Sequence, residues 1–380
     1  MKKKIVIVED NLIIQELHKH YVLNLGHEVV ACFENGQDVI DFFKENTADL
    51  ILMDIRLGDD IDGVKASQEI SEMIPVPIVF VSANSDDSTY KRAISSNMKG
   101  FLSKPISASE LEEVLEDLSN LNDSILYAER IQKSFFPQSA EITACFGDNI
   151  YVNRPKDVIS GDFCFFQHTK ENVVALVGDC TGHGVPGALL SILCAQLASN
   201  SFVESSEIYS IVESFKNRLQ NVLARGNNEY QMQDSLDYII FKINKKKSVI
   251  EITGLNRSFI YFDSQKGDHI VIQISDKEKI DKQGKLKKYA KNFTVKYNKN
   301  DLFYFFSDGI SDQFGGENDK KLTLNKFVDF LDSIVEVKDL NEKQLLFNLF
   351  LRKWQGNKKQ TDDMILLAIC PANLKDKISA

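Results

Sequence analysis

The chain of 380 residues exceeds the length of one ordinary domain, and its 43% hydrophobic and 26% charged residues are typical of a globular protein with two or three domains. Its formal net charge of −10 argues against nucleic acid as the main partner. No apolar stretch is long enough to span a bilayer, so we expect no membrane partner. The N-terminus has acidic residues where a signal peptide needs an apolar core, and the six cysteines show no CxxC spacing, so we expect a cytoplasmic protein with reduced thiols.

Residues 1–118 alternate between short apolar runs and stretches with helical spacing. The runs are KIVIVED, EVVACF, DLILMDI, PIVFVS and GFLSK. Because they are mostly continuous in Val, Ile and Leu, they predict a doubly wound, five-stranded parallel sheet covered by helices on both faces, an α/β fold. Such a sheet binds its ligand at the carboxyl ends of its strands. The polar residues at those ends are Glu9, Asp10, Asp54, Ser82 and Lys104.

A long helix is predicted next, over 107–137. Ser107 and Glu110 form a capping box at its start, and Pro137 stops it. Its apolar residues follow the 3-4-3-4-3 spacing of a coiled-coil seam: Leu111, Val114, Leu118, Leu121, Ile125 and Ala128. The same spacing also fits a single amphipathic helix packed on its own domain. We favour a helix that forms a homodimer through 111–128, because Asp, Glu and Asn fill its other faces.

Residues 140–372 are predicted to form a second domain. The strand-like runs are NVVALVGD, LDYIIFKIN, SVIEITG, SFIYFD, HIVIQIS, LFYFFSD and MILLAIC, and apolar helices are predicted at 186–200, 207–224, 323–334 and 341–353. Strands and helices are grouped rather than alternating, which indicates an α+β fold with antiparallel sheets flanked by helices.

The segment GHGVPG, residues 182–187, satisfies the G-x-G-x-x-G pattern of dinucleotide-binding loops, and Glu204 lies roughly where a ribose-binding acid would be sought. In a dinucleotide-binding unit the following helix leads to a second strand, whereas here another helix follows. Asp179 would also place a negative charge beside the pyrophosphate. We therefore reject a nucleotide site.

Aspartates flank several of the strand-like runs of the second domain. They are Asp162 in ISGDF, Asp179 in GDCTGHG, Asp308 in FFSDG, and the pair Asp362-Asp363 in QTDDM. One such aspartate is commonly a turn or cap residue, but four positions in one domain favour a metal site. Mg²⁺ and Mn²⁺ prefer carboxylate, carbonyl and water oxygens, and two metals bridged by carboxylates can activate water for attack on phosphorus.

Residues 1–118 resemble a two-component receiver domain. The match rests on the acidic pair Glu9-Asp10, on Asp54 after LILM, on Ser82 after IVFV, on Phe101, and on Lys104 followed by Pro105. The resemblance implies that Asp54 accepts the phosphoryl group and, with Glu9, Asp10 and the backbone carbonyl of Arg56, holds Mg²⁺. It also implies that Lys104 contacts the phosphate, while Ser82 and Phe101 move with it. This agrees with the chemistry, because a carboxylate is a feasible phosphoryl nucleophile and the cations neutralise the developing charge.

Residues 140–372 resemble the metal-dependent (PPM-type) serine/threonine phosphatases of the SpoIIE/RsbU-like branch. The motifs are RPKDVISGDF, VGDCTGHGVPGALLS, DSLDYIIFKIN, TGLNRSFIYF, FFSDGISDQFGGEN and QTDDMILLAI. The resemblance implies two Mn²⁺ or Mg²⁺ ions bridged by Asp179, with the backbone carbonyl of Cys180 as a further ligand. Asp162 then serves one metal, and Asp308 and Asp362 serve the other. The share of Asp363 stays open, and His183 is either a general acid or a turn or substrate-binding residue.

Together the two resemblances imply a response regulator whose output is a protein phosphatase. A sensor histidine kinase would phosphorylate Asp54, and the helix would transmit the change to the phosphatase. The expected substrate is a phosphoserine or phosphothreonine on an anti-sigma-factor antagonist. A phosphorylation-gated scaffold with an inactive phosphatase fold is the main alternative, against which the complete aspartate set argues. A DNA-binding regulator is a further alternative, but no basic recognition helix follows the receiver.

Overall fold

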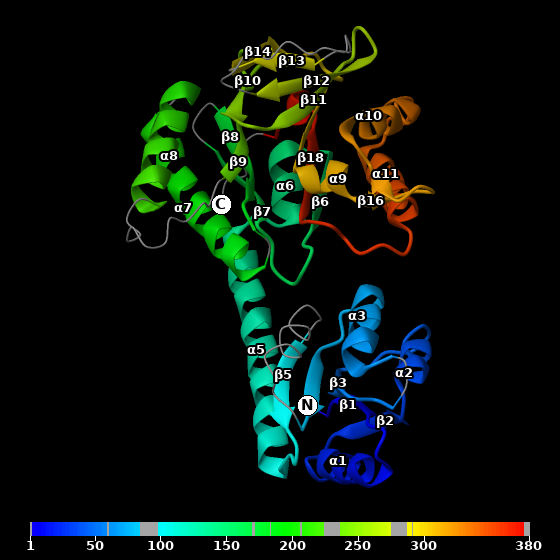
Figure 1. Ribbon diagram of the computed structural model, residues 1–380. Helices are drawn as coiled ribbons and strands as arrows, with labels where there is room; N and C mark the ends of the chain where they lie inside the picture. Colours follow the sequence, from blue (N-terminus) through cyan, green and yellow to red (C-terminus); the bar gives the residue numbers. More distant parts are fainter. Residues whose placement is uncertain are drawn as a thin grey trace. The chain divides into compact units, whose positions relative to one another are not determined.

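A computed structural model of the chain describes residues 2–58, 61–83, 98–168, 172–182, 184–205, 207–223, 236–274, 287–290 and 292–375. The chain divides into two compact units, Met1–Ser124 and Ile125–Ala380. Each unit has its own sheets and its own hydrophobic core (Figure 1).

The first unit is built on the predicted parallel sheet. Its strands are β1 (Lys4–Val8), β2 (Glu28–Phe33), β3 (Leu50–Asp54), β4 (Ile78–Ser82) and β5 (Met98–Ser103), in the order β2-β1-β3-β4-β5. Every neighbouring pair is parallel. The described helices of this unit are α1 (Leu12–Asn24), α2 (Gly36–Phe42), α3 (Gly63–Met73) and the first part of α5 (Ala108–Phe135). One apolar cluster lies on each face of the sheet, as the continuous Val and Ile runs require.

Helix α5 contributes core residues to the first unit. Leu111 and Leu115 are 0% and 2% exposed in the core of the parallel sheet, and Val114 and Leu118 pack against the same cluster. The first half of the predicted seam therefore faces its own sheet, as the single-helix alternative has it. Apolar side chains that stay exposed on α5 begin at Leu121, which is 54% exposed.

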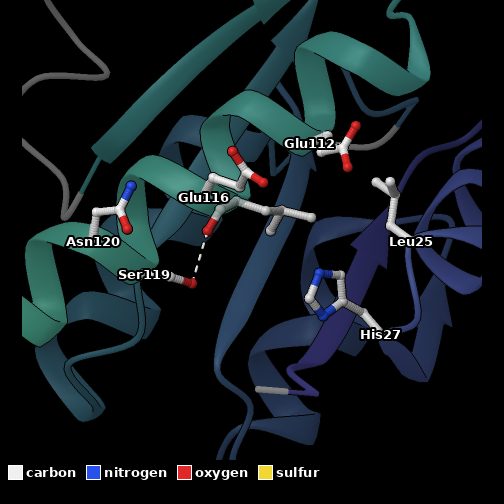
Figure 2. A pocket seen from close by; sticks show the side chains of 7 residues that line it. Leu25, His27, Glu112, Glu116, Ser119 and Asn120 are labelled. Carbon is white, nitrogen blue, oxygen red and sulfur yellow. Dashed lines mark hydrogen bonds between the residues drawn. The ribbon is translucent and has the colours of Figure 1, made fainter.

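A pocket of about 400 Å³ lies where α5 passes the turn after α1 (Figure 2). Figure 2 shows Leu25 and His27 on one side and Glu112 and Glu116 of α5 on the other. The Nδ1 atom of His27 accepts a hydrogen bond from the backbone N–H of Lys3 at 3.2 Å. Burial and the neighbouring Lys3 charge lower the pKa of His27, so its ring is neutral at neutral pH and forms no charged pair with the two glutamates.

The second unit is a sandwich of two sheets with helices on both outer sides. The first sheet has the order β14-β10-β9-β8-β7, and the second has the order β13-β12-β11-β15-β18-β6. The strands are β6 (Asn149–Arg154), β7 (Asp162–His168), β8 (Asn172–Cys180), β9 (Leu236–Asn244), β10 (Val249–Leu255), β11 (Ser258–Asp263), β12 (Asp268–Ile274), β13 (Lys287–Ala290), β14 (Asn292–Lys296), β15 (Leu302–Phe306) and β18 (Met364–Ile369). Neighbouring strands are antiparallel except β12 and β13, which confirms the predicted α+β class.

Aromatic packing joins the two sheets, and helices cover their outer faces. Phe241 of β9 stacks on Phe305 of β15 with ring centroids 4.2 Å apart, in the centre of the core between the sheets. Helices α7 (Val185–Glu204) and α8 (Ile208–Leu223) cover the first sheet, and α10 (Leu324–Ser333) and α11 (Leu340–Gln355) cover the second (Figure 1). The smaller elements are α6 (Ser139–Phe146), α9 (Asp308–Asp312), a 3₁₀ turn (Pro371–Asn373), and the hairpin of β16 (Phe314–Gly315) and β17 (Lys320–Lys321).

In the described part of the chain, α7 alone is long and apolar enough by composition to cross a membrane. Half of that apolar stretch is buried inside the second unit. Its Cys194, Ala198 and Phe202 belong to the same cluster as side chains of β7 and β8. The helix therefore covers a sheet here.

Candidate functional site

Three carboxylates of the first unit converge at the carboxyl ends of the strands. Glu9 and Asp10 follow β1, and Asp54 ends β3. Oxygens of the three carboxylates lie within 4.8 Å of one another. The Nζ atom of Lys104, beyond the end of β5, lies 2.5 Å from Oδ2 of Asp54 and 2.6 Å from Oε2 of Glu9. The backbone N–H of Arg56 donates to Oδ1 of Asp54 at 3.1 Å, so a cation and a backbone donor both face the aspartate.

Burial and the hydrogen bonds of Lys104 together set the pKa values in this acidic pocket. Burial raises the pKa of Glu9, an effect that the hydrogen bond from Lys104 opposes. Burial would lower the pKa of Lys104, but its hydrogen bonds to Asp54 and Glu9 outweigh burial and raise it. His18 is buried nearby, and burial followed by the Lys104 charge lowers its pKa to about 4. Lys104 therefore stays charged and His18 stays neutral at neutral pH.

Ser82 and Phe101 lie on the two strands next to this pocket. Ser82 ends β4, is 3% exposed, and accepts the backbone N–H of Lys104 on its carbonyl oxygen at 2.9 Å. Phe101 is half-buried on β5 and packs against the core that covers one face of the sheet. The backbone carbonyl of Asp54 approaches α3 so closely that a Cβ atom at Gly63 would lie 1.9 Å from it, so a glycine is required there.

Three aspartates of the second unit lie abreast on neighbouring strands. The antiparallel register pairs Asp162 of β7 with Asp179 of β8, and Asp179 with Asp237 of β9. Directly paired residues project from the same face of a sheet. Two residues further along these strands, Cys164, Val177 and Ile239 belong to the core between the sheets. Because every second side chain of a strand points to the same face, the three aspartates point to the face that packs against the other sheet, and they lie where that face reaches the edge of the sandwich.

The second sheet brings its own aspartates to the same edge. Asp308 follows β15 and Asp362 precedes β18, and these two strands are antiparallel neighbours. Ser307 ties the two segments together, because its N–H donates to the Ile365 carbonyl at 3.1 Å and its Oγ accepts the Ile365 N–H at 3.0 Å. A Cβ atom at Gly309 would lie 1.9 Å from the backbone oxygen of Asp363. The helix α9 can therefore pack this closely against the start of β18 only with glycine at this position.

The two adjacent aspartates differ in what their side chains contact. Asp363 is 4% exposed, and its two oxygens accept the backbone N–H groups of Lys156 and Gly161, each at 2.7 Å. Asp362 is exposed, and its Oδ1 accepts the neighbouring backbone N–H of Asp363 at 2.9 Å. Asp363 therefore fastens the 156–161 segment to β18, while most of the carboxylate of Asp362 is unoccupied by these bonds.

Gln132, near the end of α5, fastens the segment before Asp162. Its side chain is buried, and its Nε2 donates to the Ser160 carbonyl at 2.6 Å and to Oγ of Ser191 at 3.1 Å. Its Oε1 accepts the Ser160 N–H at 3.1 Å, and Oγ of Ser160 accepts the Asp162 N–H at 3.0 Å. The end of α5 is thus connected to Asp162 through two successive hydrogen-bonded steps.

A buried arginine provides counter-charge to the acidic edge. Arg257, at the turn between β10 and β11, is 8% exposed. One guanidinium nitrogen pairs with Oδ2 of Asp179, and the other lies 3.2 Å from Oδ2 of Asp308. Burial raises the pKa of Asp179 to about 7, Arg257 opposes this, and Asp308 adds to it. Burial, followed by the Asp179 charge, raises the pKa of Asp162 well above its usual range.

The donor groups at this edge fit divalent metal ions. Oδ2 of Asp162 is buried and has no hydrogen-bond partner among the described residues. Hard cations prefer carboxylates and backbone carbonyls, and Cys180 ends β8 directly beside Asp179. Within the described residues, Glu9, Asp10 and Asp54 are the only group of three whose ligand atoms lie within 4.8 Å of one another. At the edge of the second unit, Arg257 contacts both Asp179 and Asp308. Burial is the main cause of the raised pKa values of Asp162 and Asp179, and neighbouring carboxylates add to it, so a bound cation would favour the ionised form of both.

Two residues of this edge were not predicted as site residues. Asp237 and Arg257 lie in the motifs DSLDYIIFKIN and TGLNRSFIYF, and each is next to a strand end, as Asp308 is. That position made both of them candidates, but only the structure shows that they lie beside Asp179. His183 was predicted as a tentative substrate-binding residue and lies outside the described residues.

Comparisons with known proteins match both units. Residues 5–116 match the family model of the response regulator receiver domain, and residues 169–371 match that of stage II sporulation protein E (SpoIIE). Chemotaxis protein CheY of Bacillus subtilis is 32% identical over 121 residues, which are 32% of this chain and all of CheY. Osmosensing histidine protein kinase SLN1 of Saccharomyces cerevisiae is 37% identical over 122 residues, which are 30% of this chain but only 10% of SLN1.

Among solved structures, the SiaA-PP2C domain of Pseudomonas aeruginosa is similar with a TM-score of 0.57. It is 23% identical, and the match covers 67% of this chain and 98% of that domain. This likeness shows that the second unit has the PP2C fold.

The parallel sheet with its acidic pocket and the two-sheet sandwich with its row of aspartates define the class: a response regulator receiver joined to a PPM-type phosphatase domain. More specifically, the chain belongs to the SpoIIE family, whose model matches more than half of its residues.

Proposed function

We propose that this chain is a metal-dependent protein phosphatase whose activity is controlled by phosphorylation of Asp54. The observation that carries the proposal is the convergence of aspartates from two sheets on one edge, with a buried carboxylate oxygen of Asp162 left without a partner among the described residues. A buried carboxylate oxygen without a partner costs stability, and a bound cation at Asp162 would offset that cost.

The acidic edge suits two divalent cations. Asp179 would be shared by the two cations, and the Cys180 carbonyl would be a further ligand. Asp162 would serve one cation, and Asp308 and Asp362 the other. When bound, Mn²⁺ or Mg²⁺ would polarise the phosphoryl group and lower the pKa of a water. Asp363 acts as a positioning residue, because both of its oxygens hold the backbone before Asp162.

The chemistry of this edge favours phosphoserine and phosphothreonine on a protein as the substrate. These are unactivated monoesters, and their hydrolysis needs strong charge stabilisation at the phosphorus. The family resemblance extends the proposal to an anti-sigma-factor antagonist as the phosphoprotein.

The receiver pocket suits phosphoryl transfer to Asp54. Its carboxylate faces the Lys104 cation, which can neutralise charge on an incoming phosphoryl group. Glu9, Asp10 and the Arg56 carbonyl would hold Mg²⁺ beside it. Ser82 and Phe101, next to the pocket on β4 and β5, would respond to the phosphoryl group. The expected phosphodonor is a sensor histidine kinase.

A scaffold with an inactive phosphatase fold would need none of these carboxylates. Close carboxylates repel one another and destabilise a fold, yet six aspartates lie at this edge, with the buried cation of Arg257 among them. This favours an enzyme over a scaffold.

Phosphate release with Mn²⁺ and a phosphoserine protein, measured with and without acetyl phosphate as a small phosphodonor, tests the proposal. We expect Mn²⁺-dependent release that changes when the receiver is phosphorylated. The scaffold is the better description if Mn²⁺ binds and yet neither phosphoproteins nor p-nitrophenyl phosphate are hydrolysed in either phosphorylation state.

A further inference from the structure

An open groove of about 710 Å³ lies on the second unit, and its lining residues Gly315 and Lys358 are close in sequence to Asp308 and Asp362. It is bounded by the β16–β17 hairpin, the first turn of α10 and the end of α11 (Figure 1). Phe350 and the single tryptophan of the chain, Trp354, line it, and both are half-buried.

The rim of the groove is cationic. Four lysines and one glutamate line it: Lys320, Lys326, Lys353, Lys358 and Glu317. Lys358 is paired with Asp319 at 2.6 Å, and Nζ of Lys326 lies 4.1 Å from the centroid of the Trp354 ring. In the part of the chain that the structure describes, no ion pair is recorded for Lys320 or Lys353, and both are exposed. A chain with a net charge of −10 thus carries a local surface that attracts carboxylates.

The groove is connected to the acidic edge through Gln313, which is 0% exposed. The Gln313 carbonyl accepts the indole N–H of Trp354 at 3.0 Å. Its side-chain Nε2 donates to the Lys359 carbonyl at 2.9 Å, and its Oε1 accepts the Thr361 N–H at 3.1 Å. Thr361 directly precedes Asp362, and Gln313 directly follows α9, which begins at Asp308. Gln313 therefore contacts the tryptophan of the groove through its backbone carbonyl and the segment before Asp362 through its side chain, and it directly follows the helix that begins at Asp308.

We propose that this groove binds an acidic segment of the phosphoprotein substrate and so presents its phosphoserine or phosphothreonine to the acidic edge. The proposal rests on the proposed phosphatase function and adds the substrate class: a phosphoprotein with aspartates or glutamates near the phosphorylated residue. The lysines recognise the carboxylates. One face of Phe350 is stacked on Phe330 and Lys326 lies over Trp354, so the parts of these two rings that stay exposed pack against the aliphatic parts of the peptide.

The structure favours a peptide over nucleic acid as the occupant. A phosphate backbone binds extended basic surfaces with many lysines or arginines, whereas this groove is short, has Glu317 in its lining, and has its Lys358 paired with Asp319. The aspartates at the nearby edge would repel a polyphosphate chain. An acidic peptide needs only a few lysines and carries its single phosphate to the metals.

Binding is measured directly by the fluorescence of Trp354, because no other tryptophan contributes. The probe is an unphosphorylated peptide with several Asp and Glu residues, and the reference is the same peptide with Asn and Gln in their place. We expect the acidic peptide alone to change the fluorescence of the full chain saturably, and the effect to weaken at high salt. Equal responses to both peptides, or an equal response to an oligonucleotide of the same charge, would overturn the proposal.

Kinetics supply the second test, with phosphoserine versions of the same two peptides and with p-nitrophenyl phosphate. The charge-reversed variant Lys320→Glu/Lys353→Glu should raise KM for the acidic phosphopeptide at least about tenfold, with p-nitrophenyl phosphate hydrolysis unchanged. The matched control, Lys245→Glu/Lys246→Glu on the exposed turn between β9 and β10, should leave both substrates unaffected. An equal rise in KM in the groove variant and in the control variant would reject the groove as the binding site of the acidic peptide. Binding of the peptide without hydrolysis of any phosphoester would instead reject the proposed function and keep the groove.

Discussion

Arg257 pairs with Asp179, so an arginine of the chain contacts the carboxylate that we assign as the bridging ligand of two metals. The guanidinium also lies 3.2 Å from Asp308. The guanidinium uses one oxygen, Oδ2, of each of these carboxylates. A divalent cation bound at Asp179 and Asp308 would therefore compete with Arg257 for their negative charge.

The variant Arg257→Gln should bind Mn²⁺ more tightly, because the metal no longer competes with the guanidinium and the edge becomes more negative. We expect a gain of about tenfold in affinity by titration calorimetry, which is about 1.4 kcal/mol. The metal-free variant should unfold at a lower temperature, since the aspartates lose their counter-charge. Arg257→Lys is the control, and it should resemble the wild type more closely in both measurements. Weaker Mn²⁺ binding by Arg257→Gln would show that the arginine supports the metal site.

The metal-free protein should become less stable as the pH rises from about 4 to about 7. The pKa of Asp179 is raised to about 7 in the folded chain, first by burial, while an unfolded aspartate titrates near its usual value of about 3.9. Between these values the folded state binds more protons than the unfolded state, so stability falls as the pH rises. Thermal unfolding of wild type and Asp179→Asn across this range measures the effect, and the decline should be smaller in the variant.

Asp179→Asn should also lack Mn²⁺-dependent phosphate release. We expect Mn²⁺ to raise the unfolding temperature of the wild type but not that of this variant. A variant that kept both properties would disprove the assignment of Asp179 as a ligand.

Asp54→Ala should abolish phosphorylation of the receiver. With Mg²⁺ and acetyl phosphate, the wild type should form an acid-stable, base-labile adduct, because Asp54 is the carboxylate that faces both Lys104 and the Arg56 N–H. Intact mass and a phosphate-affinity gel measure the adduct. Asp41→Ala, an exposed carboxylate on α2, is the control and should be modified like the wild type. An adduct of equal yield in Asp54→Ala would place the acceptor elsewhere.

Gln132→Leu should weaken Mn²⁺ binding and remove the response to receiver phosphorylation. The leucine leaves the buried N–H of Ser160 without a partner and leaves its carbonyl only the Ser191 hydroxyl at 3.4 Å, which costs about 1–3 kcal/mol and loosens the segment before Asp162. Calorimetry and phosphate release with and without phosphodonor measure the two effects. Lys133→Ala, next in sequence but 64% exposed, should change neither. If Gln132→Leu keeps its phospho-response and its Mn²⁺ affinity, α5 acts by another contact.

Leu121→Asp should reduce dimer content and uncouple phosphorylation from phosphate release, if α5 pairs with a second copy. Leu121 is the first residue of the predicted seam that stays exposed, and like charges across a seam repel. Leu126→Asp is the control, because Leu126 is also exposed but lies about 140° around the helix. Sedimentation of the wild type and both variants decides the matter. A monomeric wild type with a full phospho-response would exclude dimerisation as the coupling mechanism.

The sequence predicts the parallel sheet and the most apolar strands of the sandwich, whereas β6, β7, β13 and β14 were not predicted. Short apolar runs such as KIVIV and LILM that alternate with helical spacing are typical of buried parallel strands, and a polar residue at the end of such a run is a candidate site residue. The hairpin of β16 and β17 was not predicted, because strands of two residues have no alternation to read. The groove beside it was therefore not predicted either.

What the sequence lacks is strand register and the partner of an amphipathic face. Asp237 becomes a site residue only because β9 pairs with β8 in the register that sets it beside Asp179. The 3-4 spacing of Leu111 and Leu118 is equally satisfied by a second helix and by the helix's own sheet, and only the structure distinguishes them. Arg257 was overlooked because nothing in its local sequence shows that it faces aspartates from two other segments.

The placement of α5 also determines how the protein can be cut into fragments. A receiver fragment that ends before residue 108 would lose Leu111 and Leu115 from its core, and a phosphatase fragment that starts after residue 135 would lose Gln132. Each fragment would then expose apolar or unpaired polar groups, and an altered activity would reflect a damaged core. A cut between Ser124 and Ile125 leaves both sets of contacts intact, so isolated halves made there are the ones whose behaviour reports on the separate domains.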